Sequence, residues 1–213
     1  MIDADAVSPH RLSAAAVRRR EAILLVADEV FLEYGFEGAS MSQVAARLGG
    51  SKGTLYSYFD SKAALFEALV VDSCARNSTA MFVTPSSTGL EERLTAFAGA
   101  YIRLINSDWA IRMLQAVATE ARRRPDIGRQ FYESGPGAAL AQLAAWIAAD
   151  VAAGNLIVDD PALAAETFTA LCRGSLHLRR VLSQAPEPDA ETMDGAVNRA
   201  VKQFLRLYGA AAR

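Results

Sequence analysis

The chain has 213 residues, of which 52% are hydrophobic and 22% are charged, with 22 basic and 24 acidic side chains. This composition favours a folded domain over a disordered chain, and no run of about 18 apolar residues is present to cross a membrane. The acidic start, MIDADAVSPHR, does not match a secretion signal, and two distant cysteines do not form a disulfide framework, so a cytoplasmic protein is expected. The average charge alone argues against a nucleic-acid binder, since the sequence pI is about 5.8.

Apolar residues recur at helical spacing along most of the chain, which predicts an all-α fold. Three helices are expected before residue 60, the first of them ending near Gly35 and Gly38, and about six longer helices are expected after it. We therefore predict an N-terminal three-helix domain at 18–62 and a larger helical bundle at 63–213. Residues 1–17 are predicted to form a disordered arm.

The segment 40–62, SMSQVAARLGGSKGTLYSYFDSK, has the pattern of two short helices joined by a glycine turn. Ser40 and Gln43 form a capping box that starts the first helix, and Ser51 caps the second. Leu55 and Phe59 are four residues apart and are expected to face the core. Two short helices joined by a turn of this length predict a helix-turn-helix.

The remaining residues of the second short helix suit contact with DNA. The N-terminal side chains of a recognition helix reach base edges in the major groove, and the free amides at its start can face a phosphate. Gly53 permits a close approach of the backbone, and Lys62 is placed for a flanking phosphate. Cationic, hydroxyl and aromatic contacts are expected from Lys52, Thr54, Tyr56 and Tyr58.

Residues 18 to about 70 resemble the DNA-binding domain of the tetracycline-repressor family, the TetR/AcrR-type regulators. The resemblance rests on REAILLVADEVFLEYGFEGAS followed by GTLYSYFDSKAALF. Gly50 departs from the family pattern, which more often has a buried valine there, and a looser turn is expected at this point. The resemblance implies that the residues contacting DNA are Ser40, Ser51, Lys52, Gly53, Thr54, Tyr56, Tyr58 and Lys62.

The rest of the chain resembles the AefR-like subgroup of C-terminal domains, in FYESGPGAALAQLAAWI and in the later segments GNL, DPALAAETF and LCRG. This resemblance implies a helical domain that binds an effector and forms a homodimer. Pockets between helices are mostly apolar, so the pocket candidates, each of which could equally belong to the core, are Phe97, Tyr101, Trp109, Met113, Phe131, Trp146, Phe168 and Cys172. Two C-terminal helices carry the candidates for the dimer interface, which are Gly174, Leu178, Val197, Val201 and Phe204.

An enzyme is not expected. Residues 49–53, GGSKG, fit the G-x-S-x-G pattern of a hydrolase nucleophile elbow, with His177 as a downstream base. An elbow needs a strand before the serine, however, and MSQVAARL is helical. Cys172 and His177 are five residues apart and lie on different helix faces, so no metal site and no cofactor are expected.

The sequence thus predicts a homodimeric transcriptional regulator that binds double-stranded DNA at a palindromic operator, associated with the bacterial nucleoid. A repressor released by a small apolar effector is expected, with a TetR-type activator and a helical protein–protein interaction module as alternatives. The near-neutral total charge does not exclude DNA, because within 38–59 Arg47 and Lys52 are accompanied by no acidic residue. So small a positive charge predicts modest affinity for non-specific DNA.

Overall fold

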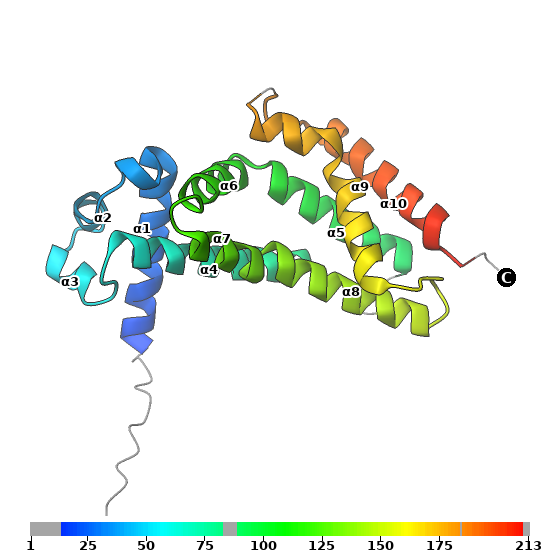
Figure 1. Ribbon diagram of the computed structural model, residues 1–213, viewed down its shortest axis with the longest axis horizontal. Coiled ribbons are helices and arrows are strands. Elements are labelled where there is room, and N and C mark those ends of the chain that lie inside the picture. The colour runs from blue at the N-terminus through cyan, green and yellow to red at the C-terminus, as the bar shows by residue number, and fades with distance from the viewer. Residues whose placement is uncertain (1–13, 83–88, 184, 211–213) are drawn as a thin grey trace, which may run out of the picture. The chain divides into compact units, whose positions relative to one another are not determined.

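The computed structural model describes residues 14–82, 89–183 and 185–210, and within these ranges it contains ten helices and no strand (Figure 1). The prediction of an all-α fold is therefore confirmed for the described residues. Seven helices follow residue 60, where about six were predicted. In chain order the helices are α1 (Ala14–Gly38), α2 (Met41–Arg47), α3 (Lys52–Tyr56), α4 (Lys62–Met81), α5 (Leu90–Asn106), α6 (Asp108–Glu120), α7 (Pro125–Ser134), α8 (Pro136–Ala152), α9 (Pro161–Val181) and α10 (Ala190–Tyr208).

The chain divides into two compact units, residues 1–69 and 70–213, and the division falls inside α4. The sequence-based boundary at 62/63 lies at the start of that same helix. The predicted arm at 1–17 falls mostly on residues 1–13, which lie outside the described residues. Residues 14–17 are helical and form the first turn of α1.

The first unit has a small apolar core made by one face of each of its helices. Phe66 of α4 is fully buried, and its ring centroid lies 4.9 Å from that of Phe31 and 5.1 Å from that of Phe36. Edge-to-face aromatic pairs at these distances add stability beyond the area that they bury. The other fully buried side chains of this core include Ile23, Leu24, Val30, Leu55 and Leu65.

The second unit is a helical bundle in which α5, α8, α9 and α10 share one continuous core. Phe168 of α9 lies at its centre, with ring centroids 5.9 Å from Phe97 of α5 and 4.8 Å from Phe204 of α10. All three rings are fully buried. The periodic apolar faces of α5 and α10 thus meet around α9, as expected of amphipathic helices in a bundle.

Two arginines tie the helices of this bundle together. Arg93 of α5 donates two hydrogen bonds to the carboxylate of Asp150 on α8, at 2.7 and 2.5 Å, and Asp150 is buried. The buried Arg180 of α9 donates to the carbonyl of Asn106 at 3.1 Å and to the carboxylate of Asp108 at 2.5 Å. Arg180 thereby fixes the junction between α5 and α6 against the last turn of α9.

Candidate DNA-binding surface and ligand cavity

The helix-turn-helix is built by the caps that the sequence predicts. The hydroxyl oxygen of Ser40 accepts a hydrogen bond from the amide of Gln43, and the hydroxyl donates to the Gln43 side chain at 2.7 Å. Ser51 accepts from the amide of Thr54 at 3.1 Å and starts α3. Gly49 has a φ of 66°, in the left-handed region that favours glycine, so the chain turns sharply between α2 and α3.

The surface of α3 is polar and the opposite side is buried. Lys52, Gly53 and Tyr56 are exposed, and the Tyr56 side chain has 48% of its surface accessible. Thr54 and Tyr58 are half-buried, whereas Leu55 and Phe59 lie in the core of the first unit. Ser40 is also half-buried, with its hydroxyl engaged in the cap. The strongest candidates for side-chain contact with DNA are therefore Lys52 and Tyr56.

The positive charge of the motif is smaller in the folded protein than in the sequence. Arg47 of α2 forms an ion pair with Glu33 of α1, with Nη2 2.6 Å from the carboxylate oxygen. Hydrogen bonds from Tyr34 and Arg47 lower the pKa of Glu33, so this pair is fully charged at neutral pH. Lys52 forms no ion pair with any described residue. Arg47 is thus partly neutralised, and Lys52 supplies most of the charge that α2 and α3 offer to a phosphate.

The side chain of Arg19 lies beside Gly50, the position at which the sequence departs from the family pattern. A Cβ atom at Gly50 would lie 2.9 Å from Nη2 of Arg19, so the guanidinium group occupies the space beside the turn. The next residue, Arg20, places its guanidinium carbon 5.4 Å from the centre of the Phe59 ring. A basic side chain from α1, that of Arg19, therefore lies beside the turn where the family pattern has a buried valine.

Lys62 does not present its charge as the sequence led us to expect. Its Nζ donates hydrogen bonds to the carbonyl oxygens of Phe36, Glu37 and Ala39, at 2.6, 3.2 and 3.0 Å, and lies 4.5 Å from the centre of the Phe36 ring. An ammonium group has three N–H donors, and all three are used here. Lys62 therefore joins the start of α4 to the end of α1, and because its donors are already engaged in the protein alone, Lys52 is the stronger candidate for a phosphate contact.

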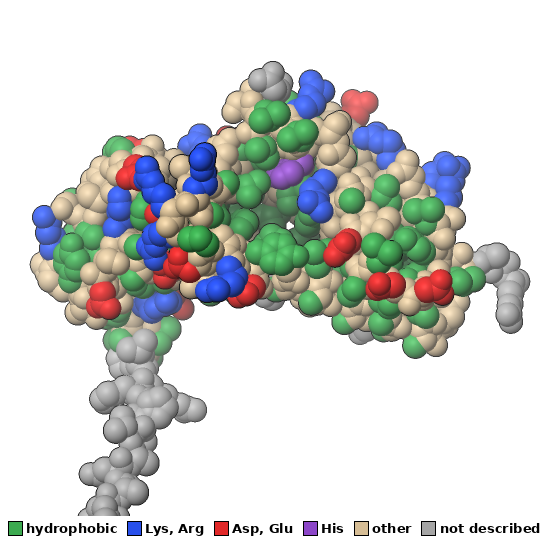
Figure 2. All heavy atoms as spheres, in the orientation of Figure 1, with side chains coloured by type: hydrophobic (Ala, Val, Ile, Leu, Met, Phe, Trp, Pro, Cys, Tyr) green, Lys and Arg blue, Asp and Glu red, His purple; other side chains and the backbone are tan. Residues whose placement is uncertain are grey.

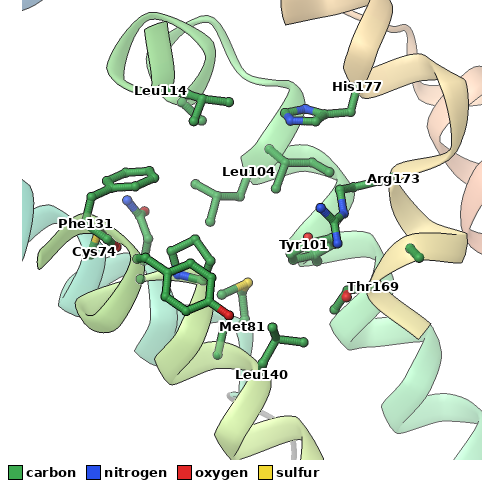
Figure 3. Close-up of a pocket in the computed structure, with 18 of the residues that line it drawn as sticks. Cys74, Met81, Tyr101, Leu104, Leu114, Phe131, Leu140, Thr169, Arg173 and His177 are labelled. Atoms are coloured by element: carbon green, nitrogen blue, oxygen red, sulfur yellow. Dashed lines mark hydrogen bonds between the residues drawn. The ribbon is translucent and has the colours of Figure 1, made fainter. Parts of the chain in front are cut away.

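The second unit encloses a cavity of about 710 Å³. Its walls come from α4, α5, α6, α7, α8 and α9, and hydrophobic side chains surround the hollow visible in Figure 2. Phe131, Met81 and Leu140 lie on one side, and Tyr101, Arg173 and His177 lie on the other (Figure 3). A volume of this size is within the range that holds drug-sized ligands.

Half of the aromatic and sulfur-containing candidates line this cavity. Tyr101, Trp109, Met113 and Phe131 do so. Phe97, Phe168 and Cys172 instead belong to the shared core of α5, α8, α9 and α10, and Trp146 packs against that core. Helical periodicity identifies the apolar face of a helix but not which part of that face is covered by a neighbour.

The cavity also has a polar wall, which the positions of the aromatic residues in the sequence do not indicate. It comes from α9 and includes Glu166, Thr169, Arg173 and His177. These residues follow helical spacing, which is a signal that could have identified them as one face. The segment 49–53 does not have the geometry of a nucleophile elbow, because helix α2, and not a strand, precedes Ser51.

Both cysteines are free and buried, and burial suppresses their acidity. It raises the pKa of Cys172 to about 12, and it also raises the pKa of Cys74, which lines the cavity. Because only the thiolate is reactive, Cys172 should not react with an aromatic disulfide reagent at about pH 8 while the protein is folded.

The absorbance of the thiol released from the reagent measures the rate of labelling, which is compared between native protein and protein in guanidinium chloride. A Cys74→Ser variant isolates Cys172, which at about pH 8 should react readily only after unfolding. Its native rate should rise with pH, because the thiolate fraction grows about tenfold per pH unit below the pKa. Rapid native labelling of this variant at about pH 8 would contradict the burial of Cys172.

The structure separates the dimer-interface candidates into two groups. Val197, Val201 and Phe204 are buried in the core of their own chain, so they are not available to a partner and these three assignments are corrected. Leu178 on α9 is 59% exposed. Gly174 has a φ of 48° and interrupts the helical geometry of α9.

Comparison with known proteins assigns both parts of the chain. Residues 23–69 match the model of bacterial regulatory proteins of the tetR family, and residues 92–210 match that of the AefR-like transcriptional repressor C-terminal domain. The chain belongs to the tetR family. As a member of this family it is a transcriptional regulator with a helix-turn-helix, and the family resemblance inferred from the sequence is confirmed.

Several relatives show how this tetR-family chain compares with others. It is 37% identical over 60 residues to the transcriptional repressor BepR of Brucella suis biovar 1, covering 28% of this chain and 29% of that protein. It is 34% identical over 93 residues to the transcriptional activator FasR of Mycolicibacterium smegmatis, covering 42% of each. The matched segments therefore span less than half of these relatives.

A solved structure matches this tetR-family chain over a greater length. The flavonoid-responsive regulator FrrA is 36% identical, with a TM-score of 0.76, and the match covers 92% of this chain and all of FrrA (100%). The described helices of the chain include none with the combination of length and hydropathy needed to cross a membrane.

Proposed function

We propose that the chain is a homodimeric repressor that binds a palindromic operator and is released from it by a small apolar effector. The observation that carries this proposal is the presence, in one chain, of a polar recognition helix and a cavity of about 710 Å³. Residues 18–62 would bind DNA, and residues 63–213 would bind the effector and form the dimer.

The exposed side of α3 supports sequence-specific DNA binding. In a dimer, two recognition helices about 34–36 Å apart would enter successive major grooves of a palindromic site. Lys52 and Tyr56 would provide the main side-chain contacts, with Ser51, Gly53, Thr54 and Tyr58 close to the backbone of the same groove. Because Lys52 provides most of the motif's unpaired charge, most of the affinity should depend on the sequence of the operator rather than on phosphates alone.

The aromatic part of the cavity wall supports an aromatic effector. Tyr101, Trp109 and Phe131 line the cavity, and the similar protein FrrA is a flavonoid-responsive regulator. To release DNA, the effector must bind more tightly to the dimer geometry that does not fit the operator, and such coupling is typically about 1–3 kcal/mol.

Activation is the second candidate function, and the likeness to the activator FasR favours it. Purified protein would be used to select bound fragments from a random DNA pool, and the selected site would be placed upstream of a reporter promoter. Lower transcription in the presence of the protein would support repression, and higher transcription would support activation. Failure to select any preferred sequence would favour the alternative of a protein–protein interaction module.

Dimerisation through the exposed face of α9 leads to a separate prediction. The exposed apolar side chains of Leu178, in the last turn of α9, and of Leu182, which caps its C-terminal end, each have 59% of their surface accessible. Leu178→Asp would place a charge in an apolar contact, so this variant should be a monomer at micromolar concentration where the wild type is a dimer.

Light scattering measures the mass of each form. Ile157→Asp is a matched control, because Ile157 is 70% exposed and precedes α9. This control should remain dimeric, and both variants should keep the helical circular-dichroism spectrum of the wild type. A dimeric Leu178→Asp protein would exclude this part of α9 from the interface.

A further inference from the structure

The cavity of the second unit has two chemically different walls. α4, α6, α7 and α8 contribute mainly apolar side chains, such as Met81, Met113 and Leu140. The charged groups Glu166 and Arg173 lie on α9, and the imidazole of His177 on the same helix borders the same space. A ligand that fills this cavity therefore meets hydrocarbon and aromatic surface on one side and polar groups on the other (Figure 3).

Arg173 brings an uncompensated positive charge to the polar wall. It forms no ion pair and no hydrogen bond with any described residue, and in Figure 3 it points from α9 towards Tyr101. Its charge opposes the effect of burial, which raises the pKa of Tyr101, so the guanidinium lies close enough to act on that phenol. A free guanidinium has a planar fork of N–H donors that matches a carboxylate or a similar anion.

His177 lies four residues after Arg173 and adds a neutral polar group. Its Nδ1 atom is buried and has no hydrogen-bond partner in the described part of the chain. Burial lowers the pKa of His177 against the opposing effect of a backbone hydrogen bond with Ile105, so the ring is uncharged at neutral pH. Buried polar atoms are usually hydrogen-bonded, and a polar group of a ligand in the cavity could supply the partner that Nδ1 lacks within the chain.

The aromatic side chains define the other half of the ligand. Tyr101, Trp109, Phe131 and Tyr132 all line the cavity, and their faces and edges suit a flat ring system. Glu166 is on the same helix as Arg173, two turns earlier, and its negative charge disfavours a second acidic group on the ligand. The site is therefore suited to one anionic group at one end of an aromatic molecule.

We infer that the cavity binds an aromatic organic anion, with its ring system against the aromatic side chains and its acidic group on Arg173 and His177. This inference rests on the proposed function, because it names the chemical class of the effector for the same cavity. It goes beyond an apolar effector in requiring a carboxylate, sulfonate or acidic phenol.

A pair of fluorescent probes with one ring system tests the charge requirement. Anilinonaphthalene sulfonate carries an anionic group, and N-phenylnaphthylamine has the same rings without it. Arg173→Gln should weaken binding of the sulfonate by about tenfold or more, as expected for loss of a charge-assisted contact, and should leave the neutral probe within about twofold. Arg179→Gln is the matched control, since Arg179 is exposed on the same helix and does not line the cavity.

Two further variants test whether the probes bind in this cavity and whether its charges affect them as expected. Leu140→Trp should fill the cavity and abolish binding of both probes. Glu166→Gln should strengthen binding of the sulfonate, because it removes a like charge. Weaker binding by Glu166→Gln, or equal effects of Arg173→Gln on both probes, would overturn the inference.

Probe binding and operator binding are measured separately, so either can fail without the other. Selection of an operator by the wild type tests the recognition helix whatever the probes do. If the neutral probe alone binds and dissociates the operator complex, the proposed apolar effector stands and the anionic class is wrong. If neither probe binds, the inference and the effector cavity are both overturned, while operator selection still supports a DNA-binding regulator.

Discussion

The double substitution Lys52→Ala and Tyr56→Ala is expected to weaken operator binding by about 30-fold or more without unfolding the protein. Contacts of this kind each contribute about 1–3 kcal/mol, so the loss of two corresponds to at least about 2 kcal/mol. Both side chains are exposed on α3 and neither belongs to the core of the first unit. Their removal should therefore act on DNA binding and not on folding.

Gel shift or fluorescence anisotropy with the selected operator measures the loss, and thermal unfolding confirms that the variant is folded. Lys202→Ala serves as the control for charge, because Lys202 is exposed on α10. Lys52→Ala alone should also reduce the salt dependence of binding by about one phosphate contact. Specific binding retained by the double variant would reject α3 as the recognition helix.

Lys62→Met is expected to lower the free energy of unfolding by about 2–4 kcal/mol. The substitution removes three hydrogen bonds from a charged donor and leaves the carbonyls of Phe36, Glu37 and Ala39 without this partner. Hydrogen bonds from charged groups contribute about 1.5–3 kcal/mol, and bonds that share one donor group are less than additive. Methionine keeps most of the apolar stem, so the change isolates the ammonium group.

Chemical denaturation measured by circular dichroism gives the free energy, and Lys52→Met is the matched control because it also removes one lysine from the same unit. The two variants should show opposite behaviour. Lys52→Met should keep the stability of the wild type and bind the operator poorly, whereas folded Lys62→Met should keep the salt dependence of binding. Wild-type stability with a reduced salt dependence in Lys62→Met would restore its role as a phosphate contact.

The local features of the DNA-binding motif could be predicted because their causes are local. The capping box at Ser40, the cap at Ser51 and the inward positions of Leu55 and Phe59 each depend on residues within four positions. Lys62 could not be assigned in this way, since the carbonyls that it binds lie 23 to 26 residues earlier in the chain. The contact exists only after α1 and α4 pack together.

In the second unit, too, contacts between distant parts of the chain could not be predicted from the sequence. The apolar spacing of Val197, Val201 and Phe204 correctly indicated one face of a helix, but it did not distinguish a face covered by α5 and α9 from one covered by a second chain. The cavity wall on α9 was missed for the converse reason, because Arg173 and His177 border empty space rather than a neighbouring side chain. Long-range packing decides both cases.

The break in α9 at Gly174 divides this helix into two segments, and both of them border the cavity. Arg173 belongs to the segment of α9 that continues into the bundle core, and His177 belongs to the segment that ends with Arg180 bound to Asp108. A ligand held by both residues would fix the angle between these two segments, with Gly174 as the pivot. The position of the second segment would then depend on whether a ligand occupies the cavity. Because Arg180 binds Asp108, the first turn of α6 would shift with that segment.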